Sequence, residues 1–158
     1  MPAPASSLDP TVGGAKLTIF AVGDTFPEVA FIDLPASSWQ QTGTGANPGY
    51  RYRDTTGAGP IKTIVLRSGK LTIRGNGAGL YSLGDAPQGE MGVALALGSG
   101  NGFCASALAR TPASAHDSTT TFDGEKGAAV PASCPDVPRP PVGSASEAFL
   151  SFPATLVD

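Results

Sequence analysis

The chain has 158 residues, of which 41% are hydrophobic and only 15% are charged, with ten Lys and Arg against thirteen Asp and Glu. This length suits one domain, because a single core typically serves about 100 to 200 residues. The charged fraction is well below the roughly 25% of an ordinary soluble protein, which favours an extracellular or assembled protein. A net charge of −3 without a basic block argues against nucleic-acid binding.

We also expect no membrane insertion, because no apolar run reaches the length of a membrane helix. The start of the chain, MPAPASS, lacks the charged and apolar regions of a signal peptide. Because of the low charge, we still expect a secreted or cell-surface protein. Its signal peptide would then be absent from this chain.

Alternating apolar runs interrupted by Gly and Pro predict short strands and almost no helix. In chain order we expect strands at Lys16–Val22, Glu28–Leu34, Tyr50–Arg53, Ile61–Arg67, Lys70–Arg74, Met91–Leu97, Phe103–Leu108 and Ala148–Leu156, with a weaker strand at Thr119–Phe122. Short strands at this spacing are typical of an all-β antiparallel sandwich, Ig-like or jelly-roll-like.

The clearest local unit is a β-hairpin over residues 61–74, with Ser68-Gly69 as its two-residue turn. Symmetric pairing about this turn places one set of side chains inside: Ile64, Leu66, Leu71 and Ile73. The opposite face is solvated and carries three cations among Thr63, Val65, Arg67, Lys70, Thr72 and Arg74.

Strand 91–97 has bulky side chains on one face and only Gly92, Ala94 and Ala96 on the other. We expect another segment to pack closely against this small-residue face. The sequence GSGNG then joins the strand to Phe103–Leu108 in a second hairpin. Residues 110–118 lack periodicity and are expected to form a surface loop.

The domain organisation follows from the prolines. We expect a β-sandwich core over residues 1–135, a largely extended proline-rich segment over 136–145 and a C-terminal strand over 146–158. The strand either completes its own sheet or adds to a neighbouring subunit, in which case head-to-tail exchange would build a filament. Its apolar residues are Phe149, Leu150, Phe152 and Leu156.

Five segments together carry a family resemblance: Leu8–Thr18, Trp39 with Gly49–Asp54, Gly59–Lys62, Phe103-Cys104 and Pro131–Pro135. They resemble an uncharacterised β-rich repeat module of predicted exported proteins from myxobacteria-like environmental bacteria, over most of residues 8–135. That module has no known activity, so the resemblance implies export and modularity and transfers no catalytic residue. In the module a further strand precedes the segment that matches Asp9–Gly14.

Cys104 and Cys134 are the only cysteines, and a pair in a small, weakly charged, β-rich chain predicts a disulfide. Closing a loop of about 30 residues would stabilise the fold by roughly 3 to 4 kcal/mol. The alternative is two unrelated buried thiols in a reducing compartment. Two cysteines and one distant His supply too few ligands for zinc, and we expect neither a metal nor a cofactor.

Three patterns resemble known sites without their required geometry. His116-Asp117-Ser118 has the residue types of a hydrolase triad, but adjacent residues cannot converge on one substrate atom. The sequence from Gly75 to Gly79 lacks the following helix of a phosphate loop, and is interpreted as a flexible turn or bulge. Asp123-Gly124-Glu125 is too short for an EF-hand calcium loop, which leaves only opportunistic calcium binding.

Trp39, Tyr50 and Tyr52 give the best small-ligand signal, because aligned aromatics on a sandwich can stack on sugar rings. The alternative, which burial statistics favour, is that they fill the core. The first functional hypothesis is therefore a non-catalytic structural subunit that assembles with itself. The alternative is a polysaccharide-binding accessory module that uses these three aromatics, and a hydrolase of unknown type is third.

Overall fold

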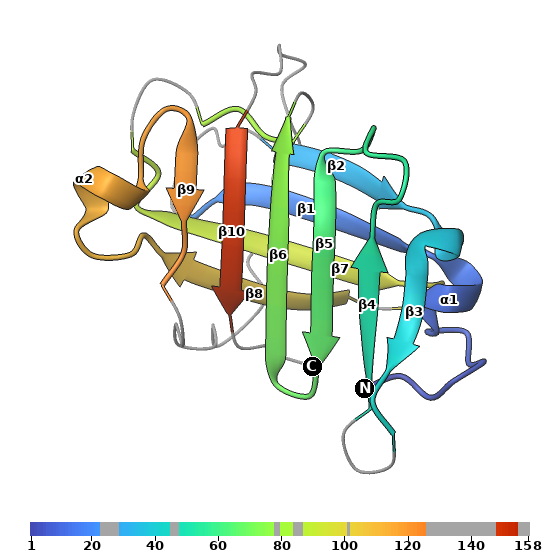
Figure 1. Ribbon diagram of the computed structural model, residues 1–158. Helices are drawn as coiled ribbons and strands as arrows, with labels where there is room; N and C mark the ends of the chain where they lie inside the picture. Colours follow the sequence, from blue (N-terminus) through green and yellow to red (C-terminus); the bar gives the residue numbers. More distant parts are fainter. Residues whose placement is uncertain are drawn as a thin grey trace.

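The computed structural model describes residues 1–22, 29–44, 48–77, 80–83, 87–100, 102–125 and 148–154. Two β-sheets lie face to face in two layers (Figure 1). The four-stranded sheet has the order β2-β1-β7-β8, with β1 (Ala15–Ala21), β2 (Val29–Leu34), β7 (Glu90–Leu97) and β8 (Gly102–Leu108). The predicted all-β, two-sheet architecture is confirmed.

The six-stranded sheet has the order β3-β4-β5-β6-β10-β9. Its strands are β3 (Trp39–Thr42), β4 (Gly49–Arg53), β5 (Ile61–Arg67), β6 (Lys70–Gly77), β9 (Thr121–Asp123) and β10 (Ala148–Ala154). Neighbouring strands are antiparallel except β9 and β10, which are parallel. Three short helical turns complete the described elements: α1 (Pro10–Gly13), η1 (Ala36–Ser38) and α2 (Ala113–His116).

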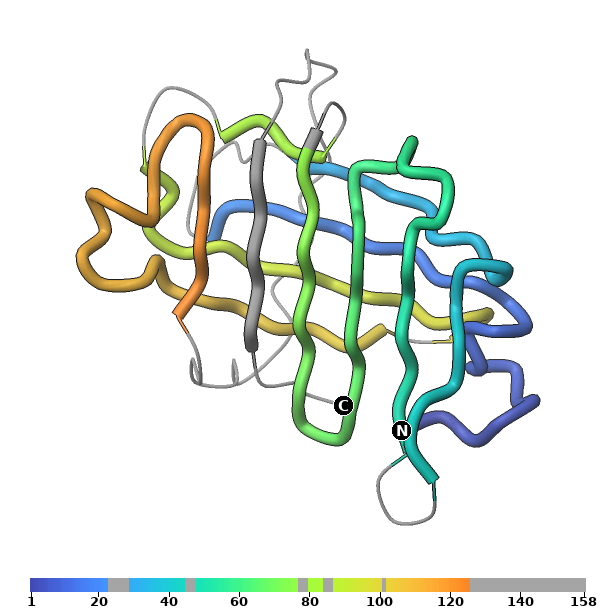
Figure 2. The backbone as a smooth tube through the Cα atoms, in the orientation of Figure 1, coloured from blue at the N-terminus to red at the C-terminus, as the bar shows by residue number. Residues whose placement is uncertain are grey.

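The strands of one sheet run across those of the other (Figure 2). An Ig-like sandwich keeps its two sheets nearly aligned, so the crossing seen here departs from that expectation and corresponds to orthogonal packing. None of the described helices has the length and apolarity needed to span a membrane.

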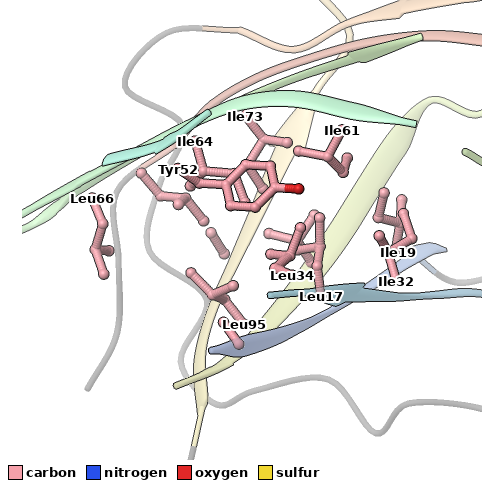
Figure 3. Packing of buried hydrophobic residues seen from close by; sticks show 14 of the residues in the cluster. Leu17, Ile19, Ile32, Leu34, Tyr52, Ile61, Ile64, Leu66, Ile73 and Leu95 are labelled. Carbon is pink, nitrogen blue, oxygen red and sulfur yellow. The ribbon is translucent and has the colours of Figure 1, made fainter. Parts of the chain in front are cut away.

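The hairpin of β5 and β6 has the predicted register. Ile64 pairs with Ile73 and Leu66 with Leu71, and all four side chains are fully buried. Figure 3 shows Ile64, Leu66 and Ile73 on the side of their sheet that faces Leu17 and its neighbours on the opposite sheet. The core is therefore the space between the sheets, and the outward side chains of each sheet face solvent or other segments.

Two local expectations are corrected. The strand β3 was missed, because its sequence WQQT has no apolar alternation. Gly75 to Gly77 continue β6 instead of forming a turn. Glycine is needed at position 75 because a side chain there would clash with the Pro60 carbonyl. The remainder of that glycine-rich sequence, residues 78–79, lies outside the described residues.

The small-residue face of β7 is closely packed, as expected. Gly92 is the register partner of Phe20 on β1, and a Cβ at Gly92 would lie 2.5 Å from the Phe20 ring. Glycine at this position therefore makes room for a buried aromatic ring.

β10 pairs with β6 and β9 of the same chain. This corresponds to the first of the two arrangements considered for the C-terminal strand, completion of its own sheet. The proline-rich segment 136–145 and Leu156 lie outside the described residues, and the side chains of Phe149, Leu150 and Phe152 do as well.

Candidate functional site

The three aromatics proposed to stack on a ligand are buried in the core. Trp39, Tyr50 and Tyr52 are 4%, 1% and 4% exposed. The rings of Trp39 and Tyr52 meet edge to face, with centroids 5.4 Å apart. This burial agrees with the alternative in which the three aromatics fill the core and does not support ligand stacking, because the aromatic face of β4 points toward the other sheet.

Tyr50 also anchors the start of the chain, which lies beside β4 (Figure 2). Its hydroxyl donates a hydrogen bond to the Pro2 carbonyl at 3.2 Å. Burial, together with the nearby charge of Asp9, raises the pKa of Tyr50. This tyrosine is a structural group and not a ligand contact.

Cys104 is fully buried in β8. The described part of the chain contains no free cysteine. Cys134, the expected partner of Cys104, lies outside the described residues, so the disulfide stays a prediction.

His116, Asp117 and Ser118 each have a separate structural role. Asp117 is buried and accepts hydrogen bonds from the backbone N–H groups of Gln88 and Gly89 at 2.9 and 2.7 Å. The Ser118 hydroxyl accepts from the backbone N–H of Thr121 at 3.1 Å. The expected surface loop over residues 110–118 is largely exposed; it contains the short helical turn α2, and its aspartate bonds to the segment that leads into β7.

Asp123, at the end of β9, is shared between two side chains of the same region, Arg110 and His116. Its Oδ2 lies 3.2 Å from Nη1 of Arg110 and 3.3 Å from Nδ1 of His116. Across the described ranges, no group of three His, Cys, Asp or Glu side chains is placed to hold a metal ion.

The strongest feature of the surface is a cluster of cations on the outer face of the six-stranded sheet. β4, β5 and β6 each contribute two of the ten Lys and Arg residues of the chain. Five of these side chains are exposed and alternate with the buried core residues, and we call them the cationic face: Arg51, Arg53, Arg67, Lys70 and Arg74.

The cationic face has no acidic counterpart on its own strands. β3, β4, β5 and β6 contain no Asp or Glu. None of its five side chains makes an ion pair with another described residue. The face therefore carries positive charge that pairs with no described carboxylate, although the chain as a whole is negative.

Asp54, which directly follows Arg53 at the end of β4, is committed to its own loop. It accepts from the hydroxyl and N–H of Thr56 and from the N–H groups of Gly57 and Gly59, at 2.7 to 3.1 Å. The Thr56 hydroxyl bond lowers the pKa of Asp54; burial opposes this, and the backbone bonds add to the lowering. Lys62 closes the same loop, with Nζ 2.8 and 2.7 Å from the carbonyls of Gly57 and Gly59.

An open pocket of about 510 Å³ adjoins one corner of the cationic face. We call it the corner pocket. It is lined by Lys62, Thr63, Arg74, Gly75, Asn76, His116, Thr121 and Asp123.

The residues that line the pocket come from β5, β6, β9 and α2, and β10 lies between β6 and β9 in the sheet. Arg74 on β6 and Asp123 on β9 are both register partners of Ser151 on β10. Neighbouring strands lie about 4.8 Å apart, so the backbones of Arg74 and Asp123 are separated by roughly 10 Å. The pocket thus has a cationic wall on β6 and a wall with a carboxylate on β9.

Sequence reasoning found the cations but not their convergence. The Arg-x-Arg pattern of β4 and the outward cations of the hairpin were visible separately. Only the pairing of β4 with β5, in which Arg51 faces Val65 and Arg53 faces Thr63, joins them into one face.

Comparisons with protein families, with curated proteins and with solved structures find no match for this chain.

Proposed function

We propose that this chain is a non-catalytic, exported β-sandwich module that binds an acidic extracellular polysaccharide on its cationic face. The observation that carries the proposal is the segregation of five exposed cations on strands that contain no carboxylate. Placing like charges together is unfavourable for the isolated protein, and a bound polyanion removes that repulsion. The proposal keeps the polysaccharide ligand of the sequence hypothesis and replaces its aromatic contacts.

The composition of the face supports a polysaccharide over a nucleic acid. Four of its five cations are arginines, whose planar guanidinium groups bind carboxylates bidentately. Gln40, Thr63 and Thr72 lie among the cations and offer hydrogen bonds to sugar hydroxyls. A sequence pI of 5.0 is far from the value above about 9 that nucleic-acid-binding domains show.

Affinity electrophoresis tests this function, with polygalacturonate or neutral dextran cast into a native gel. We expect polygalacturonate alone to retard the protein, more weakly as salt is raised. The triple substitution of Arg51, Arg53 and Arg67 to Ser should abolish retardation. Lys70→Ser should weaken it more than Lys16→Ser, which removes the same charge from the other sheet.

Two results would reject the polysaccharide function. One is equal retardation of the wild type and the triple variant by polygalacturonate. The other is tighter binding to DNA of matched charge than to polygalacturonate at the same ionic strength, which would replace the polysaccharide with a nucleic acid.

Self-assembly is the second candidate function, and the position of β10 favours it. β10 lies between β6 and β9, yet residues 124–147 separate it from β9 in the sequence. A slot between two strands accepts the same strand from a neighbouring copy with the same main-chain hydrogen bonds. Head-to-tail exchange of residues 146–158 would then build a filament.

Deletion of residues 144–158 tests this second function by size-exclusion chromatography. We expect the intact chain to associate with rising concentration and the truncated chain to remain folded and monomeric. A strictly monomeric intact chain would exclude exchange.

Export and the disulfide between Cys104 and Cys134 belong to the same proposal. The low charge, the β-rich fold and the burial of Cys104 support them. Titration of thiols in denaturant without reductant should find none, and two reactive thiols per chain would rule the disulfide out.

A further inference from the structure

The corner pocket has the size and polarity of a small-ligand site next to the proposed polymer surface. Its volume of about 510 Å³ lies within the roughly 300 to 1,000 Å³ of ligand pockets. We infer that it binds a single sugar ring bearing a carboxylate, as a uronate does, with the carboxylate on Arg74. This inference rests on the proposed function and names the unit of the polymer that the protein selects.

Arg74 is the cation available to a ligand in this pocket. It is exposed and pairs with no carboxylate in the described part of the chain. Lys62 lines the same pocket, but its ammonium group already donates to two carbonyls and lies 3.8 Å from Asp54. The guanidinium fork of Arg74 therefore defines where an anionic group binds.

The opposite wall offers an acceptor for hydroxyl groups. Asp123 uses Oδ2 for Arg110 and His116, while Oδ1 accepts from none of the described donors. An ionised Oδ1 accepts hydrogen bonds from sugar hydroxyls but not from another carboxylate. Asn76, Thr63 and Thr121 supply further polar groups between the two walls.

This polarity orients the ligand and restricts its class. The ligand needs one anionic group for Arg74 and hydroxyl donors for Asp123, whose backbones lie roughly 10 Å apart across β10. A free sulfate offers no hydroxyl donor to Asp123, and a neutral sugar leaves Arg74 without a partner. A sugar ring with one carboxylate satisfies both.

The cationic face leads directly into the pocket. Arg53 is the register partner of Thr63, and Thr63 is the register partner of Arg74. A polyuronate lying on Arg51 and Arg53 therefore reaches the pocket with its next units.

The test is an NMR titration of the full chain with D-galacturonate and with D-galactose, which differ only in the carboxylate. We expect galacturonate to shift the backbone signals of Asn76 and Thr121, and galactose to bind at least roughly tenfold more weakly. Asn76→Asp places a competing carboxylate beside Arg74 and should weaken galacturonate binding roughly tenfold. Gln41→Glu makes the same change on an exposed residue of β3 that is not part of the cationic face, and should alter this affinity less than twofold.

The outcomes separate the pocket from the polymer surface. Equal binding of galactose and galacturonate, or an unchanged affinity in Asn76→Asp, overturns the assignment of the pocket. If polygalacturonate retards the protein but galacturonate binds nowhere, the pocket inference fails while the proposed function stands. If galacturonate binds at the pocket and the polymer does not bind, the proposed function fails and the pocket remains a site for a free sugar acid.

Discussion

The outward faces of the two sheets differ sharply in charge. On the four-stranded sheet, Lys16 of β1 lies 3.7 Å from Asp33 of β2, and Glu90 of β7 is the one further charged residue of its strands. On the six-stranded sheet, the cationic face has no carboxylate on β3 to β6. One face is nearly neutral and the other is strongly positive.

This contrast indicates that the stability of the fold does not explain where the charged residues lie. An even distribution would have reduced the repulsion among the five cations at no cost to the core, because all five side chains are exposed. The core is supplied by the alternate residues of the same strands. Binding chemistry and packing can therefore be altered separately.

The largest effect is expected from a charge placed on the inner side of the charged sheet. Leu66→Asp buries an unpaired carboxylate at a position with 0% exposure and should cost several kcal/mol of unfolding free energy. Arg67→Asp, one residue further and exposed, should change it by about 0.5 kcal/mol or less. Urea denaturation of both variants measures the difference.

Equal destabilisation by the two substitutions would contradict the register of β5 and β6. A shift of one residue would exchange the faces and make Arg67 the inward position. The core assignment and the cationic face would then both fail.

A smaller loss is expected at the neutral sheet, where the outward face contains a tight contact. Gly92→Ala should destabilise the protein by roughly 1 to 3 kcal/mol, because its methyl group would overlap the Phe20 ring. Phe20→Leu should reduce this penalty when combined with Gly92→Ala, which a double-mutant cycle measures. Additive losses would show that the two residues do not share the space.

The hairpin register and the inner core could be predicted because both depend on local information. The turn at Ser68-Gly69 fixes which residues pair, and the alternation of Ile64, Leu66, Leu71 and Ile73 fixes which side is buried. The close packing at Gly92 could be anticipated for the same reason, since its strand alternates bulky and small residues.

The rest depended on contacts between residues distant in the sequence. That Tyr50 and Tyr52 face the core follows from the pairing of Tyr50 with Leu66, which neither strand specifies alone. The position of β10 between β6 and β9 required the whole topology. The corner pocket was missed because it combines residues of β5, β6, β9 and α2.

Asp54 gives an acid-dependent prediction at the edge of the cationic face. Because hydrogen bonds lower its pKa in the folded state, its stabilisation is present above the ordinary value of about 3.9 and is lost as pH falls below that value. In Asp54→Asn, one of the two carboxylate oxygens is replaced by an NH2 group that cannot accept a hydrogen bond, so Tm should fall at pH 7. The difference in Tm between this variant and wild type should shrink at acidic pH. Asp33→Asn is the control, because its side chain is 86% exposed.

An Asp54→Asn deficit that stays constant from pH 7 to pH 2.5 would show that the lost stability does not come from the ionised carboxylate. A Tm loss as large as that of Gly92→Ala would also contradict this explanation. The hydrogen bonds of one surface loop are expected to contribute less stability than a buried steric clash removes.

The smallest effect on stability is expected from the charges themselves. It tests most directly whether the outward faces of the two sheets differ in ligand binding. Lys16→Ser breaks the exposed pair with Asp33, and such pairs typically contribute less than about 0.5 kcal/mol. Lys70→Ser removes one member of a repelling group and should leave stability unchanged or raise it slightly. The two variants should therefore unfold at nearly the same urea concentration, yet Lys70→Ser should weaken retardation by polygalacturonate more than Lys16→Ser does. If Lys70→Ser instead destabilises the fold by more than 1 kcal/mol, the lysine has a packing role, and charge segregation would no longer be explained by ligand binding alone.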